Sequence, residues 1–383
     1  MRIRSLFLFF IVVVLVSCES VSDPESAINE LEPTYYYTTE EMNLIFDALS
    51  FYPNDTQLSL AIIDSSGTHY YGAERSNDSL ITIENQNSIF EIGSITKVFT
   101  SSLLAHQVIE SDLDLDTTVR SVLNFELKDS VDFTFKQLAN HTSGLPRVPG
   151  GFVWNAIFNA DNPYKNFDEE KLRAYLSEEV ELEYEAGSDH SYSNLGAGFL
   201  GYALEQTAGQ TYEELLRDYI FVPLNMTSST TQRENISDQL VTGVDRKGDE
   251  AANWDLASLV AAGGIYSSTE DMVKYAMAQL DTTNNVYKYQ KEPTYTISED
   301  QKIAMGWFII SREDGSEIYW HNGGTGGYRS SMALNPVNGT AVVVLSNISA
   351  GHSKSSLIDR LCFDLLRLAD VLSPLDRKGN SDS

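Results

Sequence analysis

The hydrophobic pattern near the amino-terminal end predicts a helix followed by a β-hairpin. Thr38, with Glu41 three residues later, is typical of a helix capping box. The apolar positions after it recur at helical spacing, and they are Met42, Ile45, Phe46 and Leu49. Next, the apolar runs 58–63 and 68–71 flank a polar turn at 64–67 that ends in glycine. This order predicts two antiparallel strands.

The carboxyl-terminal part predicts further strands and a closing helix. Short apolar runs separated by glycine-containing turns predict strands at 304–310, 317–320, 330–334 and 340–345. The last run is apolar throughout, as expected of a central strand. A closing helix is expected from apolar positions at helical spacing, which are Leu357, Ile358, Leu361, Cys362, Leu365 and Leu368.

The middle of the chain differs from both ends because its pattern is mostly helical. Helices are expected at 168–176, 212–219 and 270–280, whereas the polar stretch 281–301 predicts a loop. The overall expectation is an α/β fold, in which an antiparallel sheet is flanked by helices and carries a mostly helical inserted subdomain. The α/β part is expected at about 37–93 and 302–373, and the helical part at about 94–301.

One turn and the apolar run after it carry candidate chemistry. Gly93 precedes Ser94, and residues 98–105 contain neither glycine nor proline, which predicts a buried helix with Ser94 at its start. Lys97 lies three residues on, so its amine can reach the serine hydroxyl. A partly desolvated lysine can activate a serine as a nucleophile. A capping serine with a surface lysine is the alternative for this pair alone.

Charge and composition exclude one class of partner. The 383 residues contain 26 Lys and Arg against 55 Asp and Glu, a net charge of −29. Nucleic-acid binding needs a basic face to meet phosphates, so no nucleic-acid partner is expected. A solvated acidic surface is a sufficient explanation of the charge.

The first residues predict export and a membrane anchor. Arg2 and Arg4 precede an apolar run, 6–16, that has the length of a signal-peptide core and is short for a membrane span. The run ends in Leu-Val-Ser-Cys18, which resembles the lipobox of bacterial lipoproteins. The resemblance implies a signal peptide at 1–17, a lipidated Cys18, and an anchor and tether at 18–36. The protein is then expected at the bacterial cell envelope, on the periplasmic or outer-surface side, with the membrane as a partner. A plain secretory peptide is the alternative.

Two further short motifs could supply polar groups to a cleft. Tyr192 and Asn194 stand two residues apart on a polar turn, where a phenol and an amide can face one pocket. The segment His321-Asn322-Gly323-Gly324 follows a predicted strand, and its glycines allow close backbone approach to a ligand. Either motif alone is also compatible with ordinary turn chemistry.

Taken in order, Ser94-x-x-Lys97, Tyr192-x-Asn194 and His321-x-Gly323 resemble the three active-site motifs of the serine β-lactamase and penicillin-binding family. They are most similar to the branch of class C β-lactamases, D-aminopeptidases and related esterases. The segment 138–146, with His141-Thr-Ser-Gly, is similar to another loop of that family. The resemblance runs from about residue 40 to 370, and it implies a serine hydrolase domain at 37–373.

The resemblance also implies roles for these residues. Ser94 is expected to be the nucleophile that accepts the acyl group, and Lys97 and Tyr192 to share the role of base. A Tyr192 phenolate would need stabilisation by a Lys97 ammonium.

The substrate-binding residues are expected to be Asn194, His321, Gly323 and Gly324. Asn194 would orient Lys97 and a substrate amide. The backbone N–H groups of Ser94 and Gly324 would form the oxyanion hole.

His321 stands where the family's β-lactamases and carboxypeptidases usually carry lysine. A largely neutral imidazole holds a substrate carboxylate less firmly than an ammonium does. We therefore expect a small-molecule or peptide acyl donor that is an ester, an amide or a D-amino-acid peptide, unless Arg329 supplies the missing cation. The alternatives are a D-Ala-D-Ala carboxypeptidase, a β-lactamase, or a penicillin- or peptidoglycan-binding sensor without turnover.

Other chemistry finds little support. His141 could act as a base, although a structural hydrogen-bonding role is the more common one for a histidine in such a loop. The chain lacks a Gly-x-Ser-x-Gly elbow, a His-Glu-x-x-His motif and clustered Cys and His residues, so we expect neither a metal site nor a cofactor. Cys362 is expected to be a packed core thiol.

Overall fold

The computed structural model describes residues 25–372, except residues 35, 112, 130, 151–160 and 237. In this part the strands are β1 (Ile28–Glu30), β2 (Gln57–Asp64), β3 (Gly67–Ser76), β4 (Ser79–Ile83), β5 (Ile89–Glu91), β6 (Tyr266–Ser268), β7 (Tyr295–Thr296), β8 (Gln301–Ile303), β9 (Phe308–Ser311), β10 (Glu317–Gly324), β11 (Arg329–Asn335) and β12 (Thr340–Ser346). The α-helices are α1 (Thr39–Leu49), α2 (Thr96–Glu110), α3 (Phe135–Ala139), α5 (Glu169–Ala174), α6 (Asn194–Ala208), α7 (Tyr212–Leu216), α8 (Thr269–Leu280), α9 (Asn285–Gln290) and α10 (Ser356–Val371).

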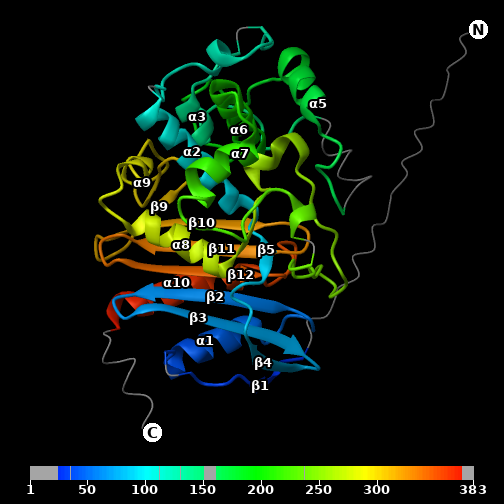
Figure 1. Ribbon diagram of the computed structural model, residues 1–383, viewed down its shortest axis with the longest axis vertical. Helices are drawn as coiled ribbons and strands as arrows, with labels where there is room; N and C mark the ends of the chain where they lie inside the picture. Colours follow the sequence, from blue (N-terminus) through cyan, green and yellow to red (C-terminus); the bar gives the residue numbers. More distant parts are fainter. Residues whose placement is uncertain are drawn as a thin grey trace, which may run out of the picture.

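A ten-stranded sheet crosses the molecule, in the order β1-β4-β3-β2-β12-β11-β10-β9-β8-β7 (Figure 1). All neighbours are antiparallel except β1 and β4. The predicted hairpin is confirmed as β2 and β3, and β2 pairs with β12 near the far end of the chain, with Ala61 opposite Val343. Both chain ends therefore build one sheet, and most helices of the intervening segment lie together on one side of it (Figure 1). The expected α/β fold is confirmed.

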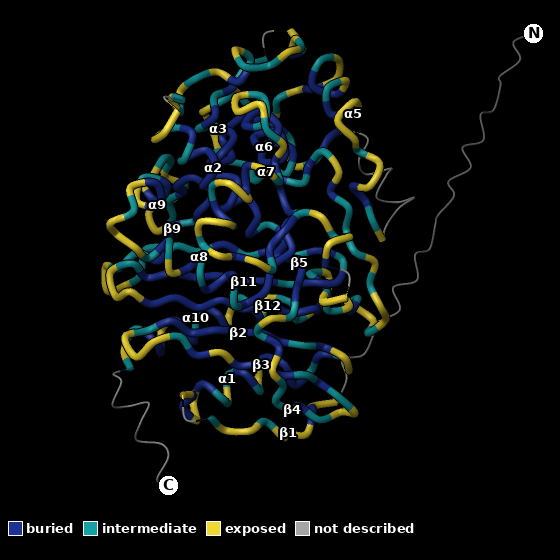
Figure 2. The backbone as a smooth tube through the Cα atoms, in the orientation of Figure 1, coloured by how far each residue is buried: buried dark blue, intermediate teal, exposed yellow. Residues whose placement is uncertain are grey.

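The central strands are buried on both faces because their two sets of side chains enter different cores (Figure 2). On β12, Val343 and Leu345 pack into the core shared with the helical part of the chain. Val342 and Val344 pack into a second core, which contains α1 and α10. The apolar run at 340–345 is thus a central strand, as predicted. Cys362 is fully buried in this second core, also as predicted.

Four local predictions were incomplete or wrong. The stretch 281–301 is not only a loop, because it contains α9 and β7. The strand expected from residue 304 starts at Phe308, since Gly306 turns the chain with a φ of +76°. Strand β10 continues through Gly324, so His321 lies within a strand rather than after one. Part of the expected tether forms β1, which pairs with β4 through Ile28 and Ser79.

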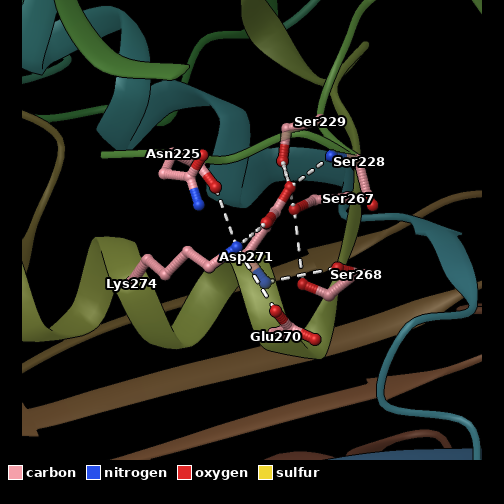
Figure 3. Close-up of polar contacts among 8 residues, drawn as sticks. All are labelled: Asn225, Ser228, Ser229, Ser267, Ser268, Glu270, Asp271 and Lys274. Atoms are coloured by element: carbon pink, nitrogen blue, oxygen red, sulfur yellow. Dashed lines mark hydrogen bonds and ion pairs between the residues drawn. The ribbon is translucent and has the colours of Figure 1, made fainter. Parts of the chain in front are cut away.

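The start of α8 is fixed by a buried carboxylate (Figure 3). Asp271 is 1% exposed, and it accepts hydrogen bonds from the Ser228 amide at 2.7 Å and the Ser229 hydroxyl at 2.9 Å. The Ser268 hydroxyl caps the helix by accepting from the Asp271 amide at 3.2 Å. Lys274 pairs with Asp271 at 2.8 Å. These bonds join the start of α8 to the loop at Ser228 and Ser229.

The predicted signal peptide and Cys18 lie outside the described residues, so the anchor remains a prediction. Within residues 25–372, leaving out the undescribed positions, none of the helices combines the length and the hydrophobicity that crossing a bilayer requires.

Candidate active site

Ser94 lies in a short 3₁₀ turn, Gly93–Ile95, that leads directly into α2. Gly93 has a φ of +52°, and a Cβ atom there would lie 2.5 Å from the amide nitrogen of Gly324, so the close approach of β10 requires glycine. One helical turn on, the Nζ atom of Lys97 donates to Ser94 Oγ at 3.1 Å and to the Ala262 carbonyl at 2.6 Å. The predicted serine–lysine contact is present.

Burial changes the ionisation of Lys97. The residue is 2% exposed, and no carboxylate pairs with it in the described part of the chain. Desolvation lowers its pKa well below the ordinary value of 10.5, and the charge of Arg147 lowers the pKa further. Both effects favour the free amine, the form that can accept a proton.

Tyr192 lies against the same lysine, with Nζ of Lys97 4.8 Å from the centre of the phenol ring. Burial raises the pKa of Tyr192 well above its usual value, and an interaction with the Ser94 side chain offsets this in part. The site therefore favours a neutral phenol beside a neutral amine. A pair of phenolate and ammonium, the alternative that the sequence left open, is disfavoured because neither charged group would be solvated.

Asn194 begins α6 beside these groups, but its contacts differ from those expected. Its side-chain nitrogen donates to the Tyr164 hydroxyl at 3.0 Å, while its Oδ1 atom is buried and has no partner among the described residues. The described hydrogen bonds of the Lys97 amine are with Ser94 and Ala262 rather than with Asn194. The unpaired Oδ1 is an acceptor free for a substrate N–H group.

Strand β10 brings the third motif to the serine. A Cβ atom on Gly323 would lie 2.0 Å from the Ile92 carbonyl oxygen, so only glycine allows this approach. The Ser330 hydroxyl on the neighbouring strand donates to the same carbonyl at 2.7 Å. The amide of Gly324 is thereby held beside the turn that carries Ser94, which is the placement that an oxyanion hole needs.

His321 is a neutral group in this site. It is 1% exposed, and burial lowers its pKa to about 3, with Lys97 and Arg329 contributing. Its Nδ1 atom is 2.7 Å from the Asn322 carbonyl, and its buried Nε2 atom has no described partner. Arg329, the alternative cation, is paired with Asp359. Neither residue offers a free positive charge to a substrate.

His141 has a structural environment. Its Nδ1 atom accepts from the Ser193 amide at 3.3 Å, and its ring packs on Tyr192 with 4.5 Å between ring centres. Burial and nearby positive charges lower its pKa well below 6.5. The histidine holds the turn that presents Tyr192, which is consistent with the structural role expected for it.

The sequence did not predict the contacts of three further residues at the site. The Ala262 carbonyl binds Lys97 from 165 residues away. The Tyr164 hydroxyl binds Asn194, and the guanidinium of Arg147 lies 5.0 Å from the ring centre of Tyr192. Two signals in the sequence could have drawn attention to them: Ala262 begins an Ala-Gly-Gly segment similar to one in the family, and Arg147 directly follows the loop 138–146.

The three predicted motifs therefore converge on one serine. The arrangement brings together a hydroxyl, an amine whose pKa is lowered by burial, a phenol and two backbone amides, and such groups are able to carry out acyl transfer. The described residues contain no group of three or more His, Cys, Asp or Glu side chains that could hold a metal ion.

Comparison with known proteins gives a consistent picture. The family model described as "Beta-lactamase" matches residues 57–363. Protein flp of Staphylococcus aureus is 27% identical over 69% of this chain and 53% of its own length, so the chain spans about half of that relative. Penicillin-binding protein 4 of Amycolatopsis lactamdurans is 25% identical over 86% of this chain and 90% of its own. A class C beta lactamase structure from Rhodobacter sphaeroides superposes with a TM-score of 0.69 at 19% identity, covering 86% of this chain and 99% of that one.

Proposed function

The chain belongs to the beta-lactamase family, and from this premise we propose that it is a serine hydrolase that forms an acyl-enzyme on Ser94. One observation carries the proposal. The Lys97 amine lies 3.1 Å from Ser94 Oγ in a buried setting that favours its unprotonated form. An amine in that state and position can take the serine proton during attack.

The proposed reaction runs in two halves. Ser94 Oγ bonds to the carbonyl carbon of the acyl donor while Lys97 accepts the hydroxyl proton. The N–H groups of Ser94 and Gly324 stabilise the oxyanion. As the bond to the leaving group breaks, Tyr192 gives its proton to the leaving group and receives one from Lys97. Water then attacks the acyl-enzyme by the reverse proton route and releases the acid and Ser94.

We propose that the acyl donor is an ester, an amide or a D-amino-acid peptide. The neutral His321 supports this choice, because it supplies no ammonium for the carboxylate that penicillins and cephalosporins carry on the ring fused to the β-lactam. The unpaired Oδ1 of Asn194 also supports it, because this oxygen can accept a hydrogen bond from an amide N–H of the acyl part. Efficient β-lactam hydrolysis and D-Ala-D-Ala carboxypeptidase activity are the alternatives that the substrate comparison below tests.

We also propose that the enzyme works at the bacterial cell envelope, held by a lipid on Cys18. The apolar run 6–16 and the Leu-Val-Ser-Cys18 sequence support this location. Metabolic labelling with an alkyne fatty acid should mark the protein, and C18S should remove the label. A wild-type protein that takes up no label would exclude the anchor.

The test of the hydrolase proposal is covalent labelling of Ser94. A fluorophosphonate probe should add one adduct by intact-protein mass spectrometry, located on Ser94 by peptide mapping, and S94A should abolish both adduct and turnover. The matched control is S101A, a buried serine of the same helix. Labelling that survives in S94A would overturn the assignment.

Turnover of a nitrophenyl ester, nitrocefin and a D-Ala-D-Ala peptide then ranks the substrates. We expect the ester to be hydrolysed fastest and nitrocefin slowest. A penicillin adduct that persists on Ser94 without turnover of any of the three would instead identify a sensor.

A further inference from the structure

An arginine that the mechanism does not use lies over the face of Tyr192. The guanidinium carbon of Arg147 is 5.0 Å from the ring centre. The backbone of Arg147 is held in place, because its carbonyl accepts hydrogen bonds from the amides of Asn194 at 2.9 Å and Leu195 at 3.3 Å. The first two residues of α6, of which Asn194 belongs to the second motif, therefore hold Arg147 next to Tyr192.

The charge of Arg147 reaches the whole site. It lowers the pKa of Lys97 and, after larger effects of burial, contributes to the pKa shifts of Tyr192 and Tyr164. These effects agree with the 5.0 Å separation between the guanidinium and the Tyr192 ring, which places Arg147 next to the candidate site.

Other positively charged candidates near Ser94 are not available to a ligand. Burial favours the free amine of Lys97 and the neutral imidazole of His321. Arg329 is occupied by Asp359. Arg147 is exposed to solvent, and no ion pair joins it to a carboxylate within the described part of the chain.

Arg173 provides a comparison for Arg147, because it is an arginine with a structural role. Arg173 also lies over a tyrosine, 5.5 Å from the ring centre of Tyr202, but it is paired with Glu169 at 2.6 Å. In a chain with 55 acidic and 26 basic residues, carboxylate partners are abundant. An exposed arginine that lies over the ring of Tyr192 without such a partner retains its hydrogen-bonding donors for a ligand.

We infer that Arg147 is an anion-binding residue of the active site, and that it recognises a carboxylate on the acyl donor near the scissile carbonyl. The inference rests on the proposed hydrolase function and defines its substrate class further. A guanidinium binds a carboxylate through two parallel hydrogen bonds, which orients the substrate as well as attracting it. In this proposal Arg147, on the loop after His141, binds the substrate carboxylate, and His321 remains uncharged.

The experiment compares three nitrophenyl or phenyl esters on the full chain. One ester is neutral, one carries a carboxylate at the end of a short acyl chain, and one carries it on the phenol that leaves. For R147Q we expect the ratio of kcat/KM for an acidic ester to that for the neutral ester to fall about 10- to 100-fold, mainly through KM. R147K should recover part of the ratio, and R173Q should leave it unchanged.

The outcomes separate this inference from the proposed function. A selective loss on either acidic ester supports an anion site, and the ester affected identifies the side of the scissile bond. Equal losses on all three esters would overturn the inference, because they would show that Arg147 acts only through Tyr192 or the fold. If the wild-type protein hydrolyses none of the esters and Ser94 takes no probe, the hydrolase proposal itself fails.

Discussion

Helices α2 and α8 both carry a lysine three residues after a polar residue at the start, yet the two lysines are in opposite electrostatic states. Lys97 follows Ser94, is buried without a carboxylate among the described residues, and has a lowered pKa. Lys274 follows Asp271, and although burial works against its charge, Asp271 and Glu270 outweigh that effect and raise its pKa (Figure 3). The sequence spacing is the same in both helices. The carboxylates near Lys274, and their absence around Lys97 among the described residues, therefore explain why the two pKa values shift in opposite directions.

The comparison shows how one helical geometry can serve two purposes. At α8 the lysine and the carboxylate satisfy one another and tie the helix to the preceding loop. At α2 the partner of the lysine is the Ser94 hydroxyl, and no described carboxylate pairs with the amine. Burying the amine in this way lowers the stability of the fold. We therefore expect a reactive lysine in α2, where no described carboxylate pairs with the amine, and a stabilising lysine in α8, where Asp271 does.

The largest expected effect comes from removing the reactive amine. K97M should lower kcat/KM for a nitrophenyl ester by about 10³-fold, because the serine loses its general base. The wild-type rate should rise with pH through the lowered pKa of Lys97, since the free amine is the active form. Stopped-flow acylation across pH checks both. A variant that keeps wild-type acylation would refute the role of Lys97.

The same variant tests the stability cost. Between the lowered pKa of folded Lys97 and its unfolded value of 10.5, the unfolded chain binds the additional proton. The free energy of unfolding of the wild type relative to K97M should therefore rise with pH in that window, by up to about 1.4 kcal/mol per unit. Urea unfolding of both proteins at several pH values measures it. A difference that falls as pH rises would contradict the assignment.

A smaller effect on rate is expected from Tyr192. Y192F removes the phenolic proton but keeps the ring against Lys97, so kcat should fall about 10²-fold through slower departure of the leaving group. The loss should shrink for esters with more acidic leaving groups, which need less protonation. Equal losses across a series of leaving groups would contradict proton donation by Tyr192.

The smallest effect on turnover is expected at α8. D271N should lower the free energy of unfolding by about 1–3 kcal/mol, because the Ser228 amide, the Ser229 hydroxyl and Lys274 lose a charged acceptor. K274M is the matched control, and its cost should stay below about 1 kcal/mol because the lysine is partly exposed. Both variants should keep ester turnover near the wild-type rate. A turnover loss as large as that of K97M would remove the distinction between the two helices.

Local signals predicted much of the fold. The capping box at Thr38 and Glu41, the hairpin around 64–67 and the apolar run of β12 each depend on neighbouring residues, and each is confirmed. Strand β1 could not be predicted, because its side chains are exposed and leave no hydrophobic pattern. The extension of β10 through Gly324 depends on pairing with β11, where Gly324 lies opposite Arg329.

At the candidate site, the motifs predicted which residues would meet but not their ionisation. Lys97, Tyr192 and His321 come together from segments about 100 residues apart or more, and their burial arises only in the folded chain. The bond from Lys97 to the Ala262 carbonyl and the placement of Arg147 over Tyr192 are tertiary contacts without a local pattern.

The central claim is that Lys97 is held as a free amine beside Ser94, and its titration tests this most directly. In a protein labelled with ¹³Cε-lysine, the Lys97 resonance is identified by its absence in K97M, and Lys274 by its absence in K274M. We expect Lys97 to titrate below the ordinary lysine value of 10.5 and Lys274 above it. A Lys97 resonance that titrates together with Lys274, or at higher pH, would contradict the account.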